Sequence, residues 1–315
     1  MAARDPVPSV VDREDFNAEV DAIALYCAMK GAGTDEDLII SIICARSYGQ
    51  LKKVEKVYQQ LYGRLLIDDL KGDLSGYFEK LSLALFMSNI EQDVVNLKEA
   101  VDGAGTDEDA IVEILCTRDN GEIELIKRLY KKRYGVKLVA DMKGDTSGDF
   151  ERIVVSMCTG MRDERGEELG EEQATAIAQI GSNEVVFNKV FCRRGFHQLR
   201  EIFAAYTQFH EDGILDTISN EFSGCTEKAY KAIAITALEG REAFFAEKLH
   251  SAMQGLGTDE DRVLRLMVSR SRQDLLTVAE RFQEKYEQSL EEFVDDDISG
   301  DFKAALLALV RGNNY

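Results

Sequence analysis

The stretch Gly31-Ala32-Gly33-Thr34-Asp35-Glu36-Asp37 occurs three times in this 315-residue chain with almost no change. The second copy spans residues 103–109, and the third, in which leucine replaces alanine, spans residues 255–261. An aspartate follows each copy 42 residues after its first glycine, within an Asp-x-Ser-Gly sequence: Asp73, Asp145 and Asp297. A turn that only starts a helix would not predict a carboxylate at this fixed distance. The pattern therefore indicates three copies of one oxygen-rich cation site.

The overall composition is that of a folded protein. Hydrophobic residues make up 45% of the chain and charged residues 30%, which excludes a disordered class. The apolar run Leu38–Ala45 is far shorter than the ~18 residues that a membrane-spanning helix needs. The segment Met1–Pro6 lacks the basic and then apolar stretch of a secretory signal. We therefore expect a cytoplasmic protein.

The charge balance restricts the possible partners. The formal net charge is −20 at pH 7, so nucleic acids and anionic membranes would both repel the chain unless a cation lay between them. Nucleic acid is therefore excluded as a partner. The six cysteines show neither Cys-x-x-Cys pairs nor histidines at zinc spacing. Three of them, Cys44, Cys116 and Cys192, share one repeat position, and we interpret them as reduced core residues.

Superposition of the three copies reveals a fourth, degenerate repeat. Offsets of 72, 148 and 224 residues bring Arg46 onto Arg118, Arg194 and Arg270. In this additional repeat Glu221 stands at the position of the distant aspartate. We expect its cation site to be weak or absent, because three loop positions are replaced by Gln179, Ser182 and Asn183.

Helical periodicity dominates the chain, and its only prolines, Pro6 and Pro8, precede the repeats. In the first repeat we predict helices near 15–29, 35–46, 49–62, 64–71 and 75–87, with Thr34 as the N-cap of the second helix. The predicted organisation is a tail (1–12), repeat 1 (13–87), repeat 2 (88–159), a hydrophilic linker between two halves of the chain (160–169), repeat 3 (170–238) and repeat 4 (239–315).

The glycine-rich stretch has two interpretations. It can be a tight turn that starts a helix with or without a metal ion, since Thr-Asp-Glu is a good helix start. It can instead be a calcium loop, in which the backbone carbonyls of Met29, Gly31 and Gly33 converge and Asp73 closes the cage. That arrangement supplies about five of the six to eight oxygen ligands that calcium takes, and it leaves room for water or an outside ligand.

From about residue 13 to 313 the chain resembles the annexin family. The resemblance rests on the four repeats, the linker before repeat 3 and the sequence Lys-Gly-x-Gly-Thr-Asp-Glu at Lys30–Glu36. It implies an all-α fold, in which four repeats of about five helices each pack into one curved disc with calcium loops on its convex face. It also implies reversible, calcium-dependent binding to anionic phospholipid membranes with phosphatidylserine-like headgroups.

The resemblance also implies which residues bind Ca²⁺. Lys30 and Arg64 match basic positions near the family's lipid-headgroup contacts, although solvated surface charges would have the same appearance. The implied calcium ligands are Met29, Gly31, Gly33 and Asp73 in repeat 1, Val101, Gly103, Gly105 and Asp145 in repeat 2, and Met253, Gly255, Gly257 and Asp297 in repeat 4.

One carboxylate against a doubly charged ion leaves a local charge of about +1, which attracts lipid phosphate. Calcium and lipid should then bind cooperatively, with a calcium affinity of about 10⁻⁴–10⁻³ M without lipid. These expectations describe a membrane adaptor or scaffold without catalytic turnover. Self-association on the membrane is compatible with them, whereas Pro6 and Pro8 argue against a partner docked on a helical tail.

Two other functions remain as alternatives. The first is a calcium-regulated ion-conducting pore, because Asp93, Glu113, Arg118 and Arg265 match positions that line a hydrophilic channel in the family. The same residues would also suit buried ion pairs that fix the packing of helices. The second is an enzyme, but His197, His210 and His250 are scattered and no nucleophile motif or phosphate-binding loop accompanies them. We therefore expect no catalytic site.

Overall fold

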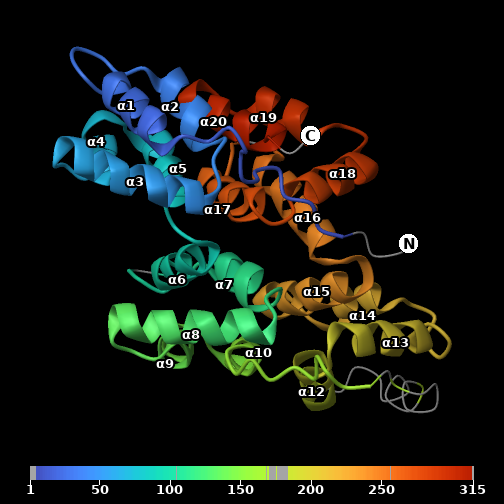
Figure 1. Cartoon of the computed structure of the whole chain (residues 1–315). Coiled ribbons are helices and arrows are strands. Elements are labelled where there is room, and N and C mark those ends of the chain that lie inside the picture. Colours follow the sequence, from blue (N-terminus) through green and yellow to red (C-terminus); the bar gives the residue numbers. More distant parts are fainter. Residues whose placement is uncertain are drawn as a thin grey trace. The chain divides into compact units, whose positions relative to one another are not determined.

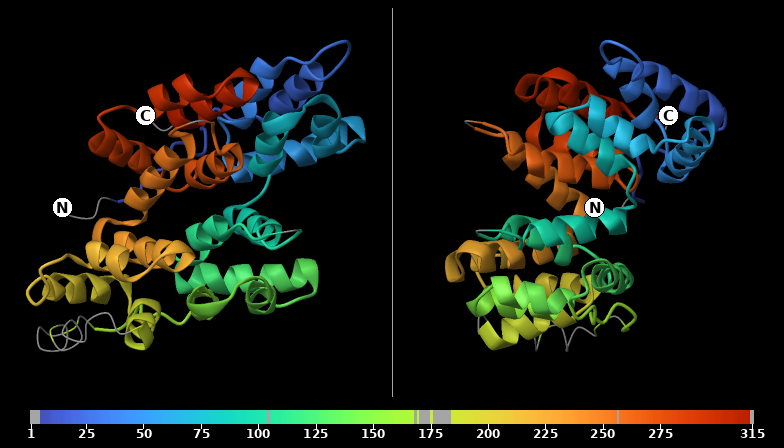
Figure 2. Two further views of the ribbon diagram at one scale, coloured as in Figure 1. Left: turned by 180° about the vertical axis from the view of Figure 1, so that it is seen from behind. Right: turned by 90° about the vertical axis from the view of Figure 1, so that its left-hand side faces the viewer.

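The computed structural model describes residues 5–103, 105–167, 169, 175, 184–255 and 257–313. Nineteen helices lie within these residues and no strand does (Figures 1 and 2). The backbones of Asp163 and Arg194 form an isolated parallel β-bridge. The all-α prediction is therefore confirmed. No helix in the described part of the chain is both long enough and apolar enough to span a membrane.

Repeats 1, 2 and 4 each contain five helices in the same order, and the described part of repeat 3 contains four. Repeat 1 contains α1 (Ala18–Ala28), α2 (Glu36–Ile43), α3 (Tyr48–Tyr62), α4 (Leu66–Asp73) and α5 (Gly76–Leu85). Repeat 2 contains α6 (Asn89–Glu99), α7 (Glu108–Leu115), α8 (Asn120–Tyr134), α9 (Leu138–Asp145) and α10 (Gly148–Met157). Repeat 3 contains α12 (Glu184–Arg193), α13 (Phe196–Tyr206), α14 (Ile214–Glu221) and α15 (Gly224–Glu239). Repeat 4 contains α16 (Arg241–Met253), α17 (Glu260–Ser271), α18 (Leu275–Tyr286), α19 (Leu290–Asp297) and α20 (Gly300–Arg311).

Local sequence signals set the ends of these helices. Ser47 and Gln50 form a reciprocal capping box at the start of α3, which satisfies backbone N–H groups that lack partners within the helix. At the other end of α3, Gly63 adopts a φ of 66°, a left-handed conformation that costs glycine little. Each helix of repeat 1 lies within a few residues of its predicted range, and α2 ends at Ile43 rather than near residue 46.

The predicted N-cap of the second helix was wrong. The cap is Asp35, whose Oδ1 accepts a hydrogen bond of 3.0 Å from the backbone N–H of Leu38. The same aspartate position caps the second helix of repeats 2 and 4, through Asp107 and Asp259. A carboxylate there also carries a full negative charge at the positive end of the helix dipole, which a threonine hydroxyl cannot supply.

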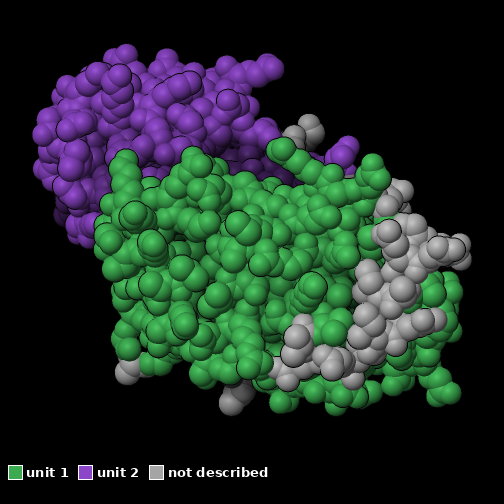
Figure 3. Space-filling model, turned by 90° about the horizontal axis from the view of Figure 1, so that it is seen from below, with its two compact units in different colours: residues 1, 93–244 green, residues 2–92, 245–315 purple. Residues whose placement is uncertain are grey.

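The helices form two compact units, which Figure 3 distinguishes by colour. Unit 1 spans residues 93–244 and holds nearly all of repeat 2 together with repeat 3. Unit 2 combines residues 2–92 with residues 245–315, and therefore joins repeat 1 to repeat 4. The linker predicted at 160–169 belongs to unit 1, so the two units do not divide the chain at that point.

Each unit has its own apolar core. In unit 1 the rings of Phe187, Phe191 and Tyr230 pack with centroids 4.2–5.1 Å apart. In unit 2 fully buried side chains such as Leu51 and Phe282 come from both repeats. The interpretation of three cysteines as core residues is confirmed, because each is free and buried, and burial raises the pKa of its thiol to about 11 or 12: Cys44, Cys116 and Cys192.

Candidate metal centres

Each glycine-rich loop is closed at its base by one backbone hydrogen bond. In repeat 1 the N–H of Asp35 donates to the carbonyl of Ala28, the last residue of α1, over 2.9 Å. The corresponding bonds of repeats 2 and 4 run from Asp107 to Ala100 and from Asp259 to Ala252, each over 2.8 Å. The capping aspartate therefore both starts the second helix and pins the loop to the end of the first helix.

The glycines of these loops hold conformations that other residues rarely adopt. The φ angle is 114° at Gly31 and 98° at Gly33, and the paired glycines of repeats 2 and 4 lie between 93° and 111°. A Cβ atom built on any of the six would meet no atom within 4 Å. The backbone conformation, rather than a lack of space, therefore requires glycine. The loop surface is exposed, which leaves it accessible to a ligand from outside.

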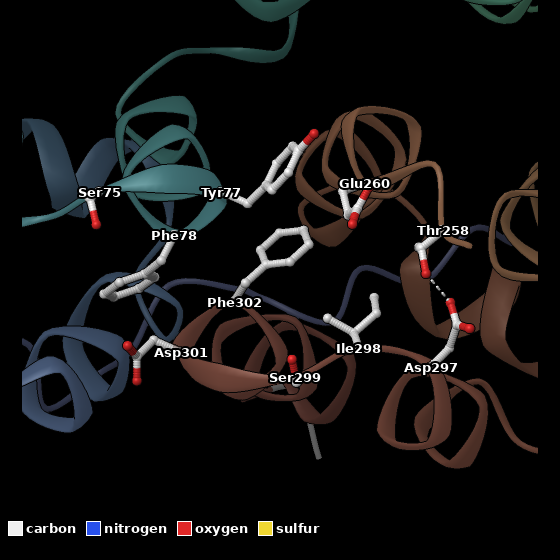
Figure 4. A pocket seen from close by; sticks show the side chains of 10 residues that line it. All are labelled: Ser75, Tyr77, Phe78, Thr258, Glu260, Asp297, Ile298, Ser299, Asp301 and Phe302. Atoms are coloured by element: carbon white, nitrogen blue, oxygen red, sulfur yellow. Dashed lines mark hydrogen bonds between the residues drawn. The ribbon is translucent and has the colours of Figure 1, made fainter. Parts of the chain in front are cut away.

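The distant acid ends the fourth helix of repeats 1, 2 and 4. Asp73, Asp145 and Asp297 are the last residues of α4, α9 and α19. In repeat 2 the hydroxyl of Thr106 donates to the backbone carbonyl of Asp145 over 3.1 Å. In repeat 4 the hydroxyl of Thr258 donates to the carboxylate of Asp297 over 2.5 Å (Figure 4). The loop threonine and the distant aspartate are thus in direct contact in two repeats.

The donor groups fit a hard cation bound mainly by backbone oxygens. Across the residues that the structure describes, no three His, Cys, Asp or Glu side chains lie close enough together to hold a metal ion. A site at these loops must therefore take most of its ligands from carbonyl groups, with one carboxylate per loop. Calcium accepts such ligand sets readily, whereas zinc prefers nitrogen and sulfur.

The distant acid of repeat 3 is a glutamate at the same place in its helix. Glu221 ends α14 and is exposed, as the acid at this position is in repeat 1. The replaced loop positions Gln179, Ser182 and Asn183 lie outside the described residues. The expectation of a weak or absent site in this repeat stays a prediction.

The two basic residues of repeat 1 have different surroundings. The guanidinium of Arg64 donates through Nε to Asp69 over 2.9 Å, and this hydrogen bond raises the pKa of Arg64. Asp69 also accepts a hydrogen bond of 2.6 Å from the hydroxyl of Tyr58. The Nζ of Lys30 lies 5.5 Å from the ring centroid of Tyr26. Both cations remain exposed.

Two ion pairs that sequence reasoning missed join neighbouring repeats. In unit 2 the Nζ of Lys80, on α5, lies 2.8 Å from Asp261 in the first turn of α17. In unit 1 the Nζ of Lys228, on α15, lies 2.9 Å from Asp109 in the first turn of α7. Both lysines occupy the same repeat position, and so do both aspartates. This recurrence of one lysine and one aspartate position was the signal in the sequence that could have predicted the two ion pairs. Each pair connects a loop helix to the neighbouring repeat.

Of the residues considered for a pore, Asp93 and Arg118 form a buried ion pair with each other. In unit 1 Arg118 makes two hydrogen bonds of 2.8 Å to Asp93, and both side chains are at most 3% exposed. Arg46 and Asp21, at the same positions of repeat 1, also pair, with a shortest distance of 2.7 Å. A pair that recurs in two repeats favours the fixation of helices over ion conduction.

Comparison with known proteins gives a consistent result. A family model described as annexin matches residues 20–85, 92–157, 171–233 and 244–309. Annexin A7 of Homo sapiens is 42% identical over 304 residues, which are 94% of this chain and 62% of that protein, so the chain spans about three fifths of this relative. The structure of chicken annexin V in complex with Zn²⁺ is 35% identical, with a TM-score of 0.93 over 98% of this chain and 100% of that chain. The structure of calcium-bound annexin (Sm)1 is 30% identical, with a TM-score of 0.83 over 97% of this chain and 93% of that chain.

Proposed function

Because this chain belongs to the annexin family, we propose that it binds anionic phospholipid membranes reversibly in the presence of calcium. The proposed sites are the loops of repeats 1, 2 and 4, each with the distant aspartate of its own repeat. The calcium-bound structure of a relative that is 30% identical to this chain supports calcium as the ion. The family is not one of enzymes, in agreement with the expectation of no catalytic site.

The contact between loop and distant acid carries this proposal. Thr258 ties the carboxylate of Asp297 to the loop of repeat 4, and Thr106 ties the backbone of Asp145 to the loop of repeat 2. The proposed ligands of repeat 1 are the carbonyls of Met29, Gly31 and Gly33 with Asp73. Those of repeat 2 are the carbonyls of Val101, Gly103 and Gly105 with Asp145, and those of repeat 4 are the carbonyls of Met253, Gly255 and Gly257 with Asp297.

The chemistry follows from the charges. Calcium, when bound, supplies two positive charges and coordination positions that a lipid phosphate can fill. The single carboxylate of each loop neutralises only part of that charge, so an acidic protein acquires local attraction for phosphate. The exposed loop backbone leaves room for the headgroup to approach. Binding of calcium and of lipid then favour each other by linkage, and chelation releases the protein from the membrane.

The test is co-sedimentation with phosphatidylserine vesicles across a calcium titration. We expect the protein to pellet with calcium and to return to the supernatant after addition of a chelator. The triple variant Asp73→Ala/Asp145→Ala/Asp297→Ala should remain in the supernatant while its helical circular dichroism is unchanged. Loss of three negative charges would by itself strengthen attraction to an anionic surface, so the predicted loss cannot result from net charge.

A matched control removes three acids elsewhere. Glu14, Asp68 and Glu211 are exposed, and their replacement by alanine changes the net charge by the same amount. This control should bind vesicles at least as well as the unmodified chain. Vesicle binding by the loop variant at the calcium concentration that suffices for the control would refute the assignment of the sites.

A further inference from the structure

Repeat 2 carries a strongly basic segment in a chain that is acidic as a whole. Residues 124–137 include six basic residues and one acid, and thus have a net charge of +5, whereas the whole chain has −20. Most of the segment belongs to α8, which lies in unit 1 (Figure 1). The basic residues are Lys127, Arg128, Lys131, Lys132, Arg133 and Lys137. None of them belongs to the proposed calcium sites or to the buried pair of Asp93 and Arg118.

The cations of α8 gather on the side of the helix that faces solvent. The buried side of this helix is formed by Ile123, Ile126 and Tyr130. Side chains three and four positions apart are neighbours on a helix, so Arg128, Lys131 and Lys132 lie together, and all three are exposed. Leu125 lies one turn before Arg128 and is 51% exposed. These four residues are named here the basic face.

The segment already holds one carboxylate. Glu124 accepts hydrogen bonds of 3.0 Å from Lys127 and 2.9 Å from Arg128, and these bonds lower the pKa of Glu124. The ammonium groups of Lys131 and Lys132 form no hydrogen bond or ion pair with any residue that the structure describes. The basic face is therefore suited to carboxylates, and two of its cations are available for carboxylates from outside.

Helix stability alone does not require these cations. Lysine and arginine in the last turn of a helix can offset the helix dipole, and the last turn of α8 holds Lys131, Lys132 and Arg133. The corresponding helix of repeat 1, α3, is equally long and has no basic residue in its last turn. A helix of this length at this place in a repeat therefore forms without them.

The basic face is particular to repeat 2. At the positions of Arg128, Lys131 and Lys132 the other repeats have Lys56, Gln59 and Gln60, then Ala204, Thr207 and Gln208, and finally Glu280, Gln283 and Glu284. At the position of Leu125 they have Lys53, Glu201 and Thr277. Repeat 2 thus combines three cations with an exposed leucine where the other repeats are mostly neutral or acidic and have a polar residue in place of the leucine.

We propose that the basic face docks a short acidic segment of a partner protein. Carboxylates of the segment pair with Arg128, Lys131 and Lys132, and an apolar side chain of the segment covers Leu125. The guanidinium of Arg128 can donate two parallel hydrogen bonds to one carboxylate, and burial of the leucine adds a contribution that does not depend on charge. This interaction needs no calcium, because none of the calcium loops takes part in it.

The charge of the chain favours a short peptide over an extended polyanion. Leu125 and Lys132 are about 10 Å apart along the helix, at 1.5 Å per residue, and charges in physiological salt are screened beyond about 8 Å. A short segment therefore meets mainly the cations of α8. A bilayer or a long nucleic acid would also extend over the surface of a chain with a net charge of −20, which repels it.

The experiment measures fluorescence anisotropy of a labelled peptide of about ten residues, in which glutamates surround a pair of leucines. A second peptide has glutamine in place of each glutamate. All titrations contain a calcium chelator, so their outcome does not depend on the proposed calcium sites. The face variant is Arg128→Gln/Lys131→Gln/Lys132→Gln. Its matched control is Lys52→Gln/Lys53→Gln/Lys56→Gln, which removes three exposed cations from α3.

We expect the unmodified chain and the control to bind the glutamate peptide equally, and the face variant to bind it about tenfold more weakly or worse. Leu125→Gln should weaken binding about two- to threefold without changing the charge. Circular dichroism establishes that each variant is folded. An equal loss in the control, equal binding of the glutamine peptide, or no binding by the unmodified chain would overturn the proposal.

A second measurement separates the classes of partner. The unmodified chain and the face variant are mixed, again in chelator, with phosphatidylserine vesicles and with a labelled single-stranded oligonucleotide. We expect neither protein to bind either probe. Binding by the unmodified chain that the face variant loses would assign the basic face to membranes or to nucleic acid and overturn the assignment to a protein segment.

Discussion

The loops of repeats 2 and 4 divide their polar contacts between two neighbouring side chains. In repeat 4 the carboxylate of Asp259 accepts a hydrogen bond of 3.0 Å from the N–H of Arg262 and so caps α17. The adjacent hydroxyl of Thr258 is then free to contact Asp297, at the end of α19. Asp259 therefore starts the helix, and the residue before it, Thr258, orients the carboxylate proposed to bind calcium.

We predict that Thr258→Val raises the calcium concentration needed for half-maximal vesicle binding by up to about fivefold. The reason is the loss of one hydrogen bond worth about 1 kcal/mol, which leaves the carboxylate of Asp297 free to rotate. Thr258→Ser keeps the hydroxyl and should restore the original calcium titration. Equal titrations for the valine and serine variants would mean that this hydrogen bond does not position Asp297.

Aromatic stacking joins the first and third helices of two repeats. The rings of Tyr26 and Tyr62 lie 3.8 Å apart in repeat 1 and are nearly parallel. In repeat 4 the same positions hold His250 and Tyr286, whose rings lie 3.7 Å apart. Burial lowers the pKa of His250, and the charge of Lys285 lowers it further. Repeat 4 thus has an imidazole, which can take up a proton in mild acid, at the position where repeat 1 has a phenol.

This difference predicts a pH effect on stability. A histidine whose pKa is lower in the folded state binds protons more readily when the chain unfolds, so the free energy of unfolding falls as the pH drops below about 6.5. We expect His250→Tyr, which restores the residue of repeat 1, to lose less stability between about pH 7.5 and pH 5. Urea unfolding at both pH values checks this, and identical losses in the two proteins would contradict it.

At the scale of the whole molecule, unit 2 is assembled from both ends of the described chain. The N–H groups of Ser9 and Val10 both donate to the carbonyl of Ser271 over 2.9 Å, and Ser9 is fully buried. The N–H of Asn313 donates to the carbonyl of Ser9 over 2.8 Å. The segment that precedes the first helix is therefore held between the end of α17 and the residues that follow α20.

Gly312 permits this close approach of the two ends. Its φ is 61°, and an added Cβ would lie 2.0 Å from the carbonyl oxygen of Ser9. We predict that Gly312→Ala destabilises unit 2 by about 1 kcal/mol or more and speeds hydrogen exchange at the amides of Val10 and Val11. Gly144→Ala is the control, because Gly144 lies within α9 with no atom within 4 Å of an added Cβ. Unchanged exchange at the tail in the Gly312 variant would mean that the ends are not held together by this contact.

The sequence by itself determined the four repeats, the helical class and the pairing in register of each loop with a distant aspartate. These features depend on helical periodicity and on residues a few positions apart, where local hydrogen bonds and backbone conformation decide the outcome. The helix cap was predicted wrongly as Thr34 instead of Asp35, because both residue types cap helices well. Only the tertiary structure decided that repeat 1 packs with repeat 4, that Lys80 pairs with Asp261 and that the rings of Tyr77 and Phe302 lie 5.4 Å apart. Those contacts join residues that are far apart in the chain. The burial of apolar helix faces brings them together, and this driving force is non-directional, so no fixed spacing in the sequence reveals which faces will meet.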